Sequence, residues 1–231
     1  LTVKVVAGLG SQLIEGRLGY ENRPLVLKVD TLGLSRKRDG EIHLGGLSTL
    51  LFPDLFRDSG IEISKLQMLR TIPMPDVGLE GNILTGLTIR RYESFSECPS
   101  FSSLQTPEHL KELKRWGIHI LFKKAQDGSI IIGDSHEYAG VNDMDDLGFE
   151  IKHHINQLMF KEAQKIVSFD VSAIASTWAG FYAQHPEKDI VEIDIENKIH
   201  IRTAIGGKGM TSSAGYAEKS IQKIFSTHPV Y

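Results

Sequence analysis

The sequence contains a single cysteine, Cys98, among its 231 residues. No disulfide can form within it, which excludes the disulfide-stapled secreted domains and favours a cytoplasmic protein. Long apolar runs are also missing, since no stretch reaches the roughly 20 residues that a membrane-spanning helix needs. We therefore expect a cytoplasmic protein without a membrane partner.

An excess of charge of one sign is missing too. Lysine and arginine number 26 against 29 aspartates and glutamates, which leaves a net charge of −3. This balance gives no electrostatic basis for binding nucleic acid, so we expect no nucleic-acid partner. The sequence also lacks a Gly-x-Ser-x-Gly elbow and a Gly-Lys-Ser/Thr phosphate loop. Serine-hydrolase and nucleotide-triphosphatase activities therefore have no support.

What the sequence does contain is a glycine turn near its C-terminal end. Alternating apolar positions in Ile199–Thr203 predict a strand. Gly206, Gly207 and Gly209 follow, and a missing Cβ lets the backbone turn sharply or approach a ligand there. The small residues at 211–215 then predict the start of a helix. Backbone N–H groups and the positive end of such a helix would face an anion or an electron-rich ring.

The front of the chain carries only part of a second glycine pattern. A predicted strand at Leu1–Val6 is followed by Gly8 and Gly10, which is how a dinucleotide-binding fingerprint begins. Leu13 occupies the position of the third glycine, and Gly16 helps to break any helix that would follow. The fingerprint is therefore incomplete.

Several segments together resemble the FAD-dependent oxidoreductases of the D-amino-acid oxidase and glycine oxidase family. The glycine turn is similar to the last flavin-contacting segment of that family. Further similar segments occur upstream in the expected order: Gly40–Phe56, Lys65–Arg70, Gly117–Phe122 with Asp127–Glu137, and Trp178–Tyr182. In the family these are a late strand of the dinucleotide domain, the first strand of the substrate domain, its central hairpin and a substrate-contacting strand.

The resemblance implies an α/β fold, in which an α+β substrate domain has an antiparallel sheet flanked by helices. Remnants of an FAD-binding dinucleotide domain are expected at both chain ends. We expect a partial or rearranged FAD-domain segment over residues 1–60, a substrate-binding domain over 61–185 and a C-terminal return to the FAD domain over 186–231. Family members carry many more residues at their front, so we expect this chain to be the C-terminal portion of a larger flavoenzyme.

FAD is the cofactor that the resemblance implies. Its ring takes a hydride from the substrate, so we expect no side chain to act as a catalytic residue. The resemblance places these residues at the flavin: Gly45, Gly46, Gly206, Gly207, Lys208, Gly209, Met210 and Thr211. Lys208 would add positive charge near the reduced ring, or it is simply a solvent-facing lysine of the turn.

The implied substrate is a small amine or amino acid, but its recognition differs from the family pattern. Related enzymes bind the substrate carboxylate with an arginine at the position of Tyr182, and some have a second arginine at the position of Gly207. A tyrosine cannot form a bidentate charged pair. We therefore expect an anionic group of the substrate to be bound elsewhere.

Arg90 and Arg91, with Tyr92 beside them, are the candidates for binding that anion. A strand predicted over residues 83–92 would point the two arginines to opposite faces, one of them inward. An arginine fork suits a phosphonate as well as a carboxylate, so an aminophosphonate joins the candidate substrates. The competing interpretation is that both arginines are solvated.

His119 and His136 are further candidates for contacting the substrate. His119 faces opposite to its apolar neighbours in the predicted hairpin, toward the flavin cavity or toward water. His136 lies at a strand end, where family members approach the substrate. Asp134, His136 and Glu137 also suggest a metal, but no second cluster supplies the missing ligands at a recognisable spacing, so we predict no metal site.

Other local patterns predict the surrounding elements. Residues 118–123 and 129–133 are expected to form a hairpin. Asp145 and Asp146 precede an amphipathic helix and are expected to cap it. A second hairpin is expected over residues 190–203.

These patterns predict an FAD-dependent oxidoreductase that acts on a small amine, amino acid or aminophosphonate by oxidative deamination or dealkylation. The alternative is a catalytically silent fragment, or a small-molecule binding module, that keeps the substrate-domain fold without FAD. The two differ in whether the chain holds FAD without a complete fingerprint. The assembly state stays open, a homo-oligomer included.

Overall fold

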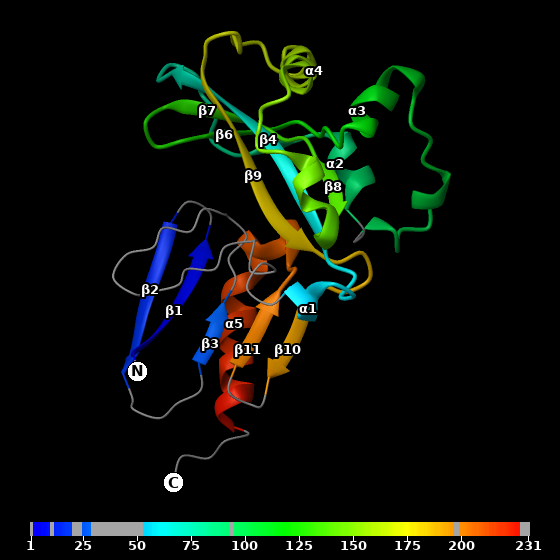
Figure 1. Cartoon of the computed structure of the whole chain (residues 1–231). Coiled ribbons are helices and arrows are strands. Elements are labelled where there is room, and N and C mark those ends of the chain that lie inside the picture. Colours follow the sequence, from blue (N-terminus) through cyan, green and yellow to red (C-terminus); the bar gives the residue numbers. More distant parts are fainter. Residues whose placement is uncertain are drawn as a thin grey trace. The chain divides into compact units, whose positions relative to one another are not determined.

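The structure is a computed structural model that describes residues 2–9, 12–19, 25–28, 53–92, 95–195 and 199–226 (Figure 1). Gly45 and Gly46, which the sequence places at the flavin, lie outside the described residues. The chain forms two compact units. The first comprises residues 1–64, 138–146 and 181–231, and the second comprises residues 65–137 and 147–180.

The first unit begins with an antiparallel hairpin. β1 (Thr2–Leu9) contains most of the strand predicted at the front of the chain, and β2 (Gln12–Gly19) runs back along it. A dinucleotide fingerprint needs a helix after its first strand. The return strand agrees with the prediction that the fingerprint is incomplete.

A mixed sheet and a long helix follow in the same unit. The sheet has the order β10 (Val191–Ile195), β11 (Ile199–Thr203) and β3 (Leu25–Lys28). β10 and β11 are antiparallel, which confirms the hairpin predicted over residues 190–203, whereas β3 and β11 are parallel. The short helix α1 (Pro53–Phe56) and the helix α5 (Gly209–Ser226), which follows β11, complete the unit.

The second unit is organised around an antiparallel sheet with the strand order β5–β6–β7–β4–β8, and β9 also pairs with β4. Its strands are β4 (Glu62–Pro73), β5 (Ile83–Leu84), β6 (Leu121–Lys124), β7 (Ser129–Gly133), β8 (Glu137–Gly140) and β9 (Ile174–Gln184). Its helices are α2 (Gly86–Arg91), α3 (Lys111–Arg115) and α4 (His153–Ala163). β4, β8 and β9 contribute residues to both units. β6 and β7 confirm the predicted central hairpin.

The core of the second unit lies between this sheet and α4. Ile130 and Ile132 of β7 are fully buried, as are Ile155 and Met159 of α4. The two α4 residues are four positions apart, so they lie on one helix face, as the amphipathic pattern predicts. Burying each such side chain contributes roughly 1.5–3 kcal/mol. The predicted α/β class, with an antiparallel sheet flanked by helices, is therefore confirmed.

The strand predicted over residues 83–92 is wrong, because only Ile83 and Leu84 form a strand before α2 begins at Gly86. Leu87 and Thr88 are both buried, with 9% and 4% of their surface exposed. Successive side chains of a strand point to opposite faces, whereas a helix can bury two neighbours together. Burial on one side of the segment therefore overrides its strand-like composition.

The predicted capping of α4 by Asp145 and Asp146 is also wrong. Both lie in a run of 3₁₀ turns at Val141–Leu147, and α4 begins later, at His153. The backbone N–H of Lys152, directly before α4, donates to the side-chain oxygen of buried Gln67 at 2.7 Å. Gln67, a residue of β4, therefore accepts a hydrogen bond at the start of α4, where the sequence predicts that two local carboxylates act as the cap.

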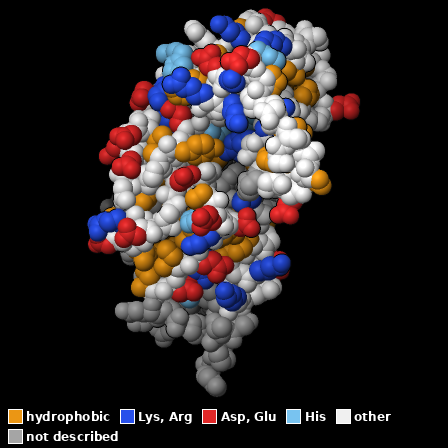
Figure 2. Space-filling view, turned by 90° about the vertical axis from the view of Figure 1, so that its right-hand side faces the viewer, with side chains coloured by type: hydrophobic (Ala, Val, Ile, Leu, Met, Phe, Trp, Pro, Cys, Tyr) orange, Lys and Arg blue, Asp and Glu red, His pale blue; other side chains and the backbone are white. Residues whose placement is uncertain are grey.

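The surface carries charge of both signs. Acidic and basic side chains are interspersed over most of the face shown in Figure 2. Within the part of the chain that the structure describes, no helix combines the length and the apolar character needed to cross a membrane.

Candidate functional site

Two histidines and an aspartate meet in the second unit, and we call His119, Asp134 and His136 the His–Asp–His cluster. His119 precedes β6 and Asp134 follows β7, and each donates its backbone N–H to the other's carbonyl oxygen at 3.1 Å. The peptide bond before Asp134 is cis. One possible ligand atom from each of the three side chains lies within 4.8 Å of the other two. A backbone ladder thus brings together residues that are distant in the sequence.

The cluster is almost entirely buried. His119 and His136 expose only 2% and 3% of their surface. Nε2 of His119 lies 2.8 Å from Oδ1 of Asp134, and Nε2 of His136 lies 3.7 Å from Oδ2. The two imidazole rings are stacked, with centroids 5.3 Å apart. Both rings therefore direct the same type of nitrogen at one carboxylate.

The other nitrogen of each ring has its own partner. Nδ1 of His119 lies 3.2 Å from Oγ1 of Thr88, and Nδ1 of His136 lies 3.3 Å from the carbonyl oxygen of Gly117. Gly117 adopts a left-handed conformation with φ of 58°, and the backbone of His136 packs directly against its Cα. These contacts fix the orientation of both rings.

Electrostatics inside the cluster favour a charged carboxylate beside a neutral imidazole. Burial would raise the pKa of Asp134, but the close contact with His119 and the charges of His136 and Arg91 hold it below its ordinary value. Burial lowers the pKa of His136 to about 4, against the opposing effect of Asp134 and with help from Arg91. At neutral pH, Asp134 is therefore ionised and His136 is uncharged.

Four of the six substrate-contacting residues expected from the sequence lie at this cluster. Besides the two histidines these are Tyr92, whose ring meets the His119 ring edge-on at 6.0 Å, and Arg91, whose guanidinium lies 5.2 Å from the Tyr92 ring centre. Arg90 instead donates to the carbonyl oxygens of Gly86 and Gln105, at 3.4 Å each.

Tyr182, the sixth expected residue, belongs to the first unit and is buried on β9. Sequence reasoning missed Thr88 as a member of the cluster's surroundings and did not place Asp134 at its centre. The hairpin register was the signal that could have paired Asp134 with His119.

The glycine turn of the first unit has the strand–turn–helix form that the sequence predicts. β11 ends at Thr203, and the chain passes through left-handed conformations at Ala204 (φ 61°) and Gly206 (φ 63°). A 3₁₀ turn over Gly206–Lys208 leads directly into α5. A Cβ at Gly206 would lie 3.3 Å from that of Gln184, so the missing side chain is used for close packing.

Two buried hydroxyl groups flank this turn without a hydrogen-bond partner among the described residues. They are Oγ1 of Thr203, before the turn, and Oγ of Ser213, in the first turns of α5. Lys208 forms an ion pair with Asp189 at 2.7 Å, and Met210 is largely exposed. The turn therefore offers glycine backbone, a helix start and two unused hydroxyls.

A pocket of about 510 Å³ opens beside the first turns of α5. It is lined by Asp189, Ile190, Ile205, Lys208, Ser212, Gly215, Tyr216 and Lys219. Its lining includes two lysines and an aspartate, and Lys208 and Asp189 form an ion pair with each other at 2.7 Å.

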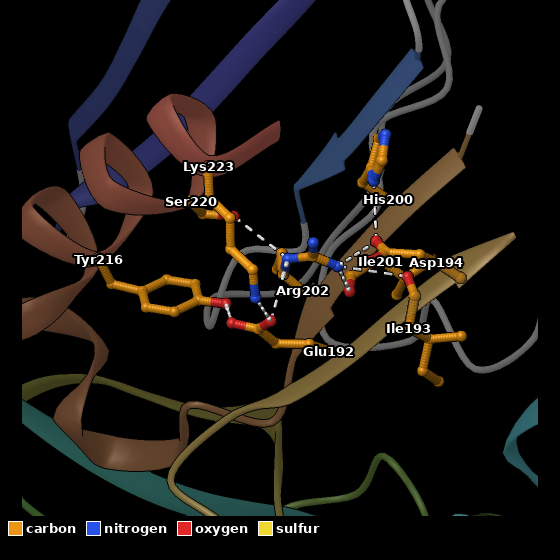
Figure 3. A network of polar contacts seen from close by, with 9 residues as sticks. All are labelled: Glu192, Ile193, Asp194, His200, Ile201, Arg202, Tyr216, Ser220 and Lys223. Carbon is orange, nitrogen blue, oxygen red and sulfur yellow. Dashed lines mark hydrogen bonds and ion pairs between the residues drawn. The ribbon is translucent and has the colours of Figure 1, made fainter. Parts of the chain in front are cut away.

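A network around Arg202 joins β10 and β11 to α5 (Figure 3). The buried guanidinium donates from Nη1 to Oδ1 of Asp194 at 2.7 Å and to the carbonyl oxygens of Ile193 and Ile201. Its Nε donates to Oγ of Ser220 on α5 at 3.1 Å. The hydrogen bond from Arg202 to Asp194 lowers the pKa of Asp194 more than any other interaction, with His200 adding to the effect and burial opposing it.

Glu192 forms the second half of the network. Its carboxylate accepts a hydrogen bond from the hydroxyl of Tyr216 at 2.6 Å and another from Nζ of Lys223 at 3.3 Å. The bond from Tyr216 is the main reason that the pKa of Glu192 is lowered, whereas burial raises the pKa of Tyr216. Because its charges are matched internally, the network is a structural connection between sheet and helix.

Comparison with known proteins shows a distant structural likeness and no match by sequence. No protein-family model matches the chain, and no curated protein matches it. Among solved structures, it is similar to the glycerol-3-phosphate dehydrogenase from Bacillus halodurans, which was crystallised with FAD. The identity is 14% and the TM-score 0.48, over 82% of this chain and 33% of that enzyme. The chain thus spans about a third of that enzyme, and a likeness of this extent assigns neither family nor function. Membership of the D-amino-acid oxidase family stays a prediction.

Proposed function

We propose that this chain is part of an FAD-dependent oxidoreductase that acts on a small amine, amino acid or aminophosphonate. The observation that carries the proposal is the passage from β11 through the turn at Gly206–Lys208 into α5. The predicted flavin segment folds as a strand, a glycine turn and a helix start. This arrangement offers the positive end of a helix dipole to an electron-rich group.

Two features of the turn support a flavin there. Gly207 is exposed and has no side chain, so its backbone is open to a ligand, whereas Gly206 is packed against Gln184. Thr203 and Ser213 supply buried hydroxyls without partners among the described residues, and a buried polar group of that kind calls for a hydrogen-bonding ligand. The charge of Lys208 is paired with that of Asp189. We therefore assign the stabilisation of negative charge on the flavin to the backbone amides and the start of α5.

The cofactor and the protein would have different roles in the proposed reaction. Bound FAD would supply the acceptor for a hydride from the carbon next to the substrate nitrogen. The amides at residues 207–210 and the start of α5 would stabilise negative charge on that acceptor. No side chain of the turn has to act as a nucleophile.

Arg91 is the residue that best supports an anionic group on the substrate. Its charge acts on Asp134 and His136, and its guanidinium lies against Tyr92. The planar fork of arginine suits either a carboxylate or a phosphonate. Arg90 points to backbone carbonyl oxygens instead and makes the matched control.

Titration of the purified chain with FAD, followed by visible absorption and flavin fluorescence, tests the cofactor. We expect saturable binding by the wild-type chain and about tenfold weaker binding by Gly207→Asp, since roughly 1.4 kcal/mol of charge repulsion gives a factor of ten. Gly207 is exposed and does not adopt a positive φ, so the variant should fold. Gly81→Asp is the control, because Gly81 has no atom within 4 Å of its missing side chain.

The outcomes separate the proposal from its alternatives. No binding of FAD by the wild-type chain would leave the silent fragment or the flavin-free binding module. Equal binding by the wild type and Gly207→Asp would remove the glycine turn as the flavin site. Bleaching of a bound flavin by an aminophosphonate, with a KM raised at least about tenfold in Arg91→Gln but not in Arg90→Gln, would support the substrate class.

A further inference from the structure

We propose that His119, Asp134 and His136 form a binding site for a divalent transition-metal ion, with zinc as the ion of choice. The inference does not depend on flavin binding, since all three residues belong to the second unit and the glycine turn belongs to the first. It also departs from the sequence prediction, which finds no metal site.

The spacing of the three side chains suits one small ion. Zinc lies about 2.0–2.1 Å from histidine nitrogen and about 2.0–2.2 Å from carboxylate oxygen, so two tetrahedral ligand atoms stand about 3.4 Å apart. Nε2 of His119 lies 2.8 Å from Oδ1 of Asp134 and Nε2 of His136 lies 3.7 Å from Oδ2, so the two separations bracket that value, each at its own carboxylate oxygen. All three side chains can therefore reach one centre with small adjustments.

The central contact does not meet the geometry of a good hydrogen bond. Nε2 of His119 and Oδ1 of Asp134 are buried and 2.8 Å apart, yet among the described residues neither atom has a hydrogen-bond partner of acceptable geometry. A buried polar atom without a partner costs about 1–3 kcal/mol. A cation between the nitrogen and the oxygen would satisfy both atoms at once.

The outer nitrogens are arranged as metal-binding histidines require. A histidine that binds metal through Nε2 normally donates its Nδ1–H to an oxygen, which fixes the ring. Nδ1 of His136 faces the carbonyl oxygen of Gly117, which can only accept, so Nδ1 is the donor there. Nδ1 of His119 faces the hydroxyl of Thr88. Both Nε2 atoms are thereby directed inward.

The donor set and its surroundings narrow the choice of ion. Two imidazoles and one carboxylate match a zinc site with an open fourth position, and the same set occurs with ferrous iron. The guanidinium of Arg91 opposes a cation here, so we expect weaker binding than at a four-ligand structural site. Glu137 is not among the residues whose ligand atoms come together here, and its Oε1 pairs with Lys152.

Zinc binding is best measured on the chain as purified, after removal of any affinity tag. We expect one zinc ion per chain by elemental analysis and by titration against a chromogenic chelator. Cobalt substitution should give the intense visible bands of a four-coordinate ion. His119→Ala and Asp134→Asn should each weaken zinc binding at least about 100-fold. Thr88→Val, which removes the hydroxyl beside Nδ1 of His119 but no ligand atom, should weaken it about tenfold.

His109→Ala is the matched control, because His109 is exposed in the 3₁₀ turn directly before α3 and lies outside the cluster. Binding should be unchanged in that variant. The proposal fails if the wild-type chain binds no zinc, or if Asp134→Asn and His109→Ala bind it equally. Binding of iron in preference to zinc would overturn the choice of ion. Circular dichroism checks the fold of each variant, and the wild-type stoichiometry and cobalt spectrum decide the matter if a variant unfolds.

Discussion

His119 and Asp134 are direct partners across the hairpin of β6 and β7. Each donates its backbone N–H to the carbonyl oxygen of the other at 3.1 Å, which is the hydrogen-bonded pair of an antiparallel ladder. Their side chains therefore leave the hairpin on the same face, and Nε2 of His119 reaches to 2.8 Å from Oδ1 of Asp134. A site set by a ladder is held more rigidly than one carried by a loop.

Gly117 is predicted to be indispensable for placing His136. An added Cβ would lie 2.7 Å from the Cβ of His136 and 2.8 Å from its carbonyl oxygen, and the φ of 58° disfavours any other residue. We expect Gly117→Ala to lower the free energy of unfolding by about 1–3 kcal/mol. Urea unfolding followed by tryptophan fluorescence measures this, because both tryptophans, Trp116 and Trp178, lie in the second unit.

Gly81→Ala is the control for this substitution, since its Cβ would meet no atom within 4 Å. Its unfolding free energy should stay within about 0.5 kcal/mol of the wild type. Equal stabilities of Gly117→Ala and Gly81→Ala would show that the packing of His136 against Gly117 is not required.

All three residues of the His–Asp–His cluster can be read from the sequence, but the contact between His119 and Asp134 cannot. Asp134 and His136 are two positions apart and stand out in a motif search, whereas His119 lies fifteen positions before Asp134. Only the register of the hairpin brings them together, and a one-residue slip would move His119 to the opposite face. A hairpin is predictable from its turn, but its register is decided by packing.

Elsewhere in the fold, too, some elements follow from local sequence and others depend on tertiary packing. The strand, glycine turn and helix around Gly206 follow from local pattern and were predictable. Residues 86–91 form a helix against their strand-like composition, because the core accepts Leu87 and Thr88 on the same side. The start of α4 depends on Gln67, which is distant in sequence, so no local signal near Asp145 could have located it.

Gln67 is predicted to stabilise the start of α4 where the local carboxylates do not. Its side-chain oxygen accepts the N–H of Lys152 at 2.7 Å, and its nitrogen donates to Asn156 at 2.6 Å and to the Lys152 carbonyl at 3.2 Å. Gln67→Met keeps the volume but removes the partner of these part-buried groups of Lys152 and Asn156. We expect a loss of about 1–3 kcal/mol in unfolding free energy by tryptophan fluorescence.

Asp145→Asn is the comparison for Gln67→Met. Asp145 lies in the preceding 3₁₀ segment and is exposed, so its unfolding free energy should change by less than about 0.5 kcal/mol. A larger loss of unfolding free energy in Asp145→Asn than in Gln67→Met would show that the carboxylates, and not Gln67, stabilise the start of α4.

Asp194 is predicted to make the first unit sensitive to acid. Hydrogen bonding from Arg202, with help from His200, holds the pKa of Asp194 below its ordinary value of 3.8 in the folded chain. The charged carboxylate therefore stabilises the fold above that value, and the contribution disappears as the pH falls through the lower, folded pKa. Asp194→Asn should lower stability by about 1 kcal/mol at neutral pH, a modest value because Asp194 is partly exposed and screened.

Hydrogen exchange of β10, β11 and α5, read by mass spectrometry across pH with a chelator present, tests this linkage. The difference in protection between the wild type and Asp194→Asn should be constant near neutral pH and should shrink below pH 3.8. Asp189→Asn serves as the control, because its ion pair with Lys208 lies on the surface, where such pairs contribute little. A difference that persists unchanged into acid, or that grows there, would mean that Arg202 does not stabilise the ionised form of Asp194 in the folded chain. The network in Figure 3 would then hold α5 to the sheet through its neutral hydrogen bonds, chiefly the bond from Arg202 to Ser220.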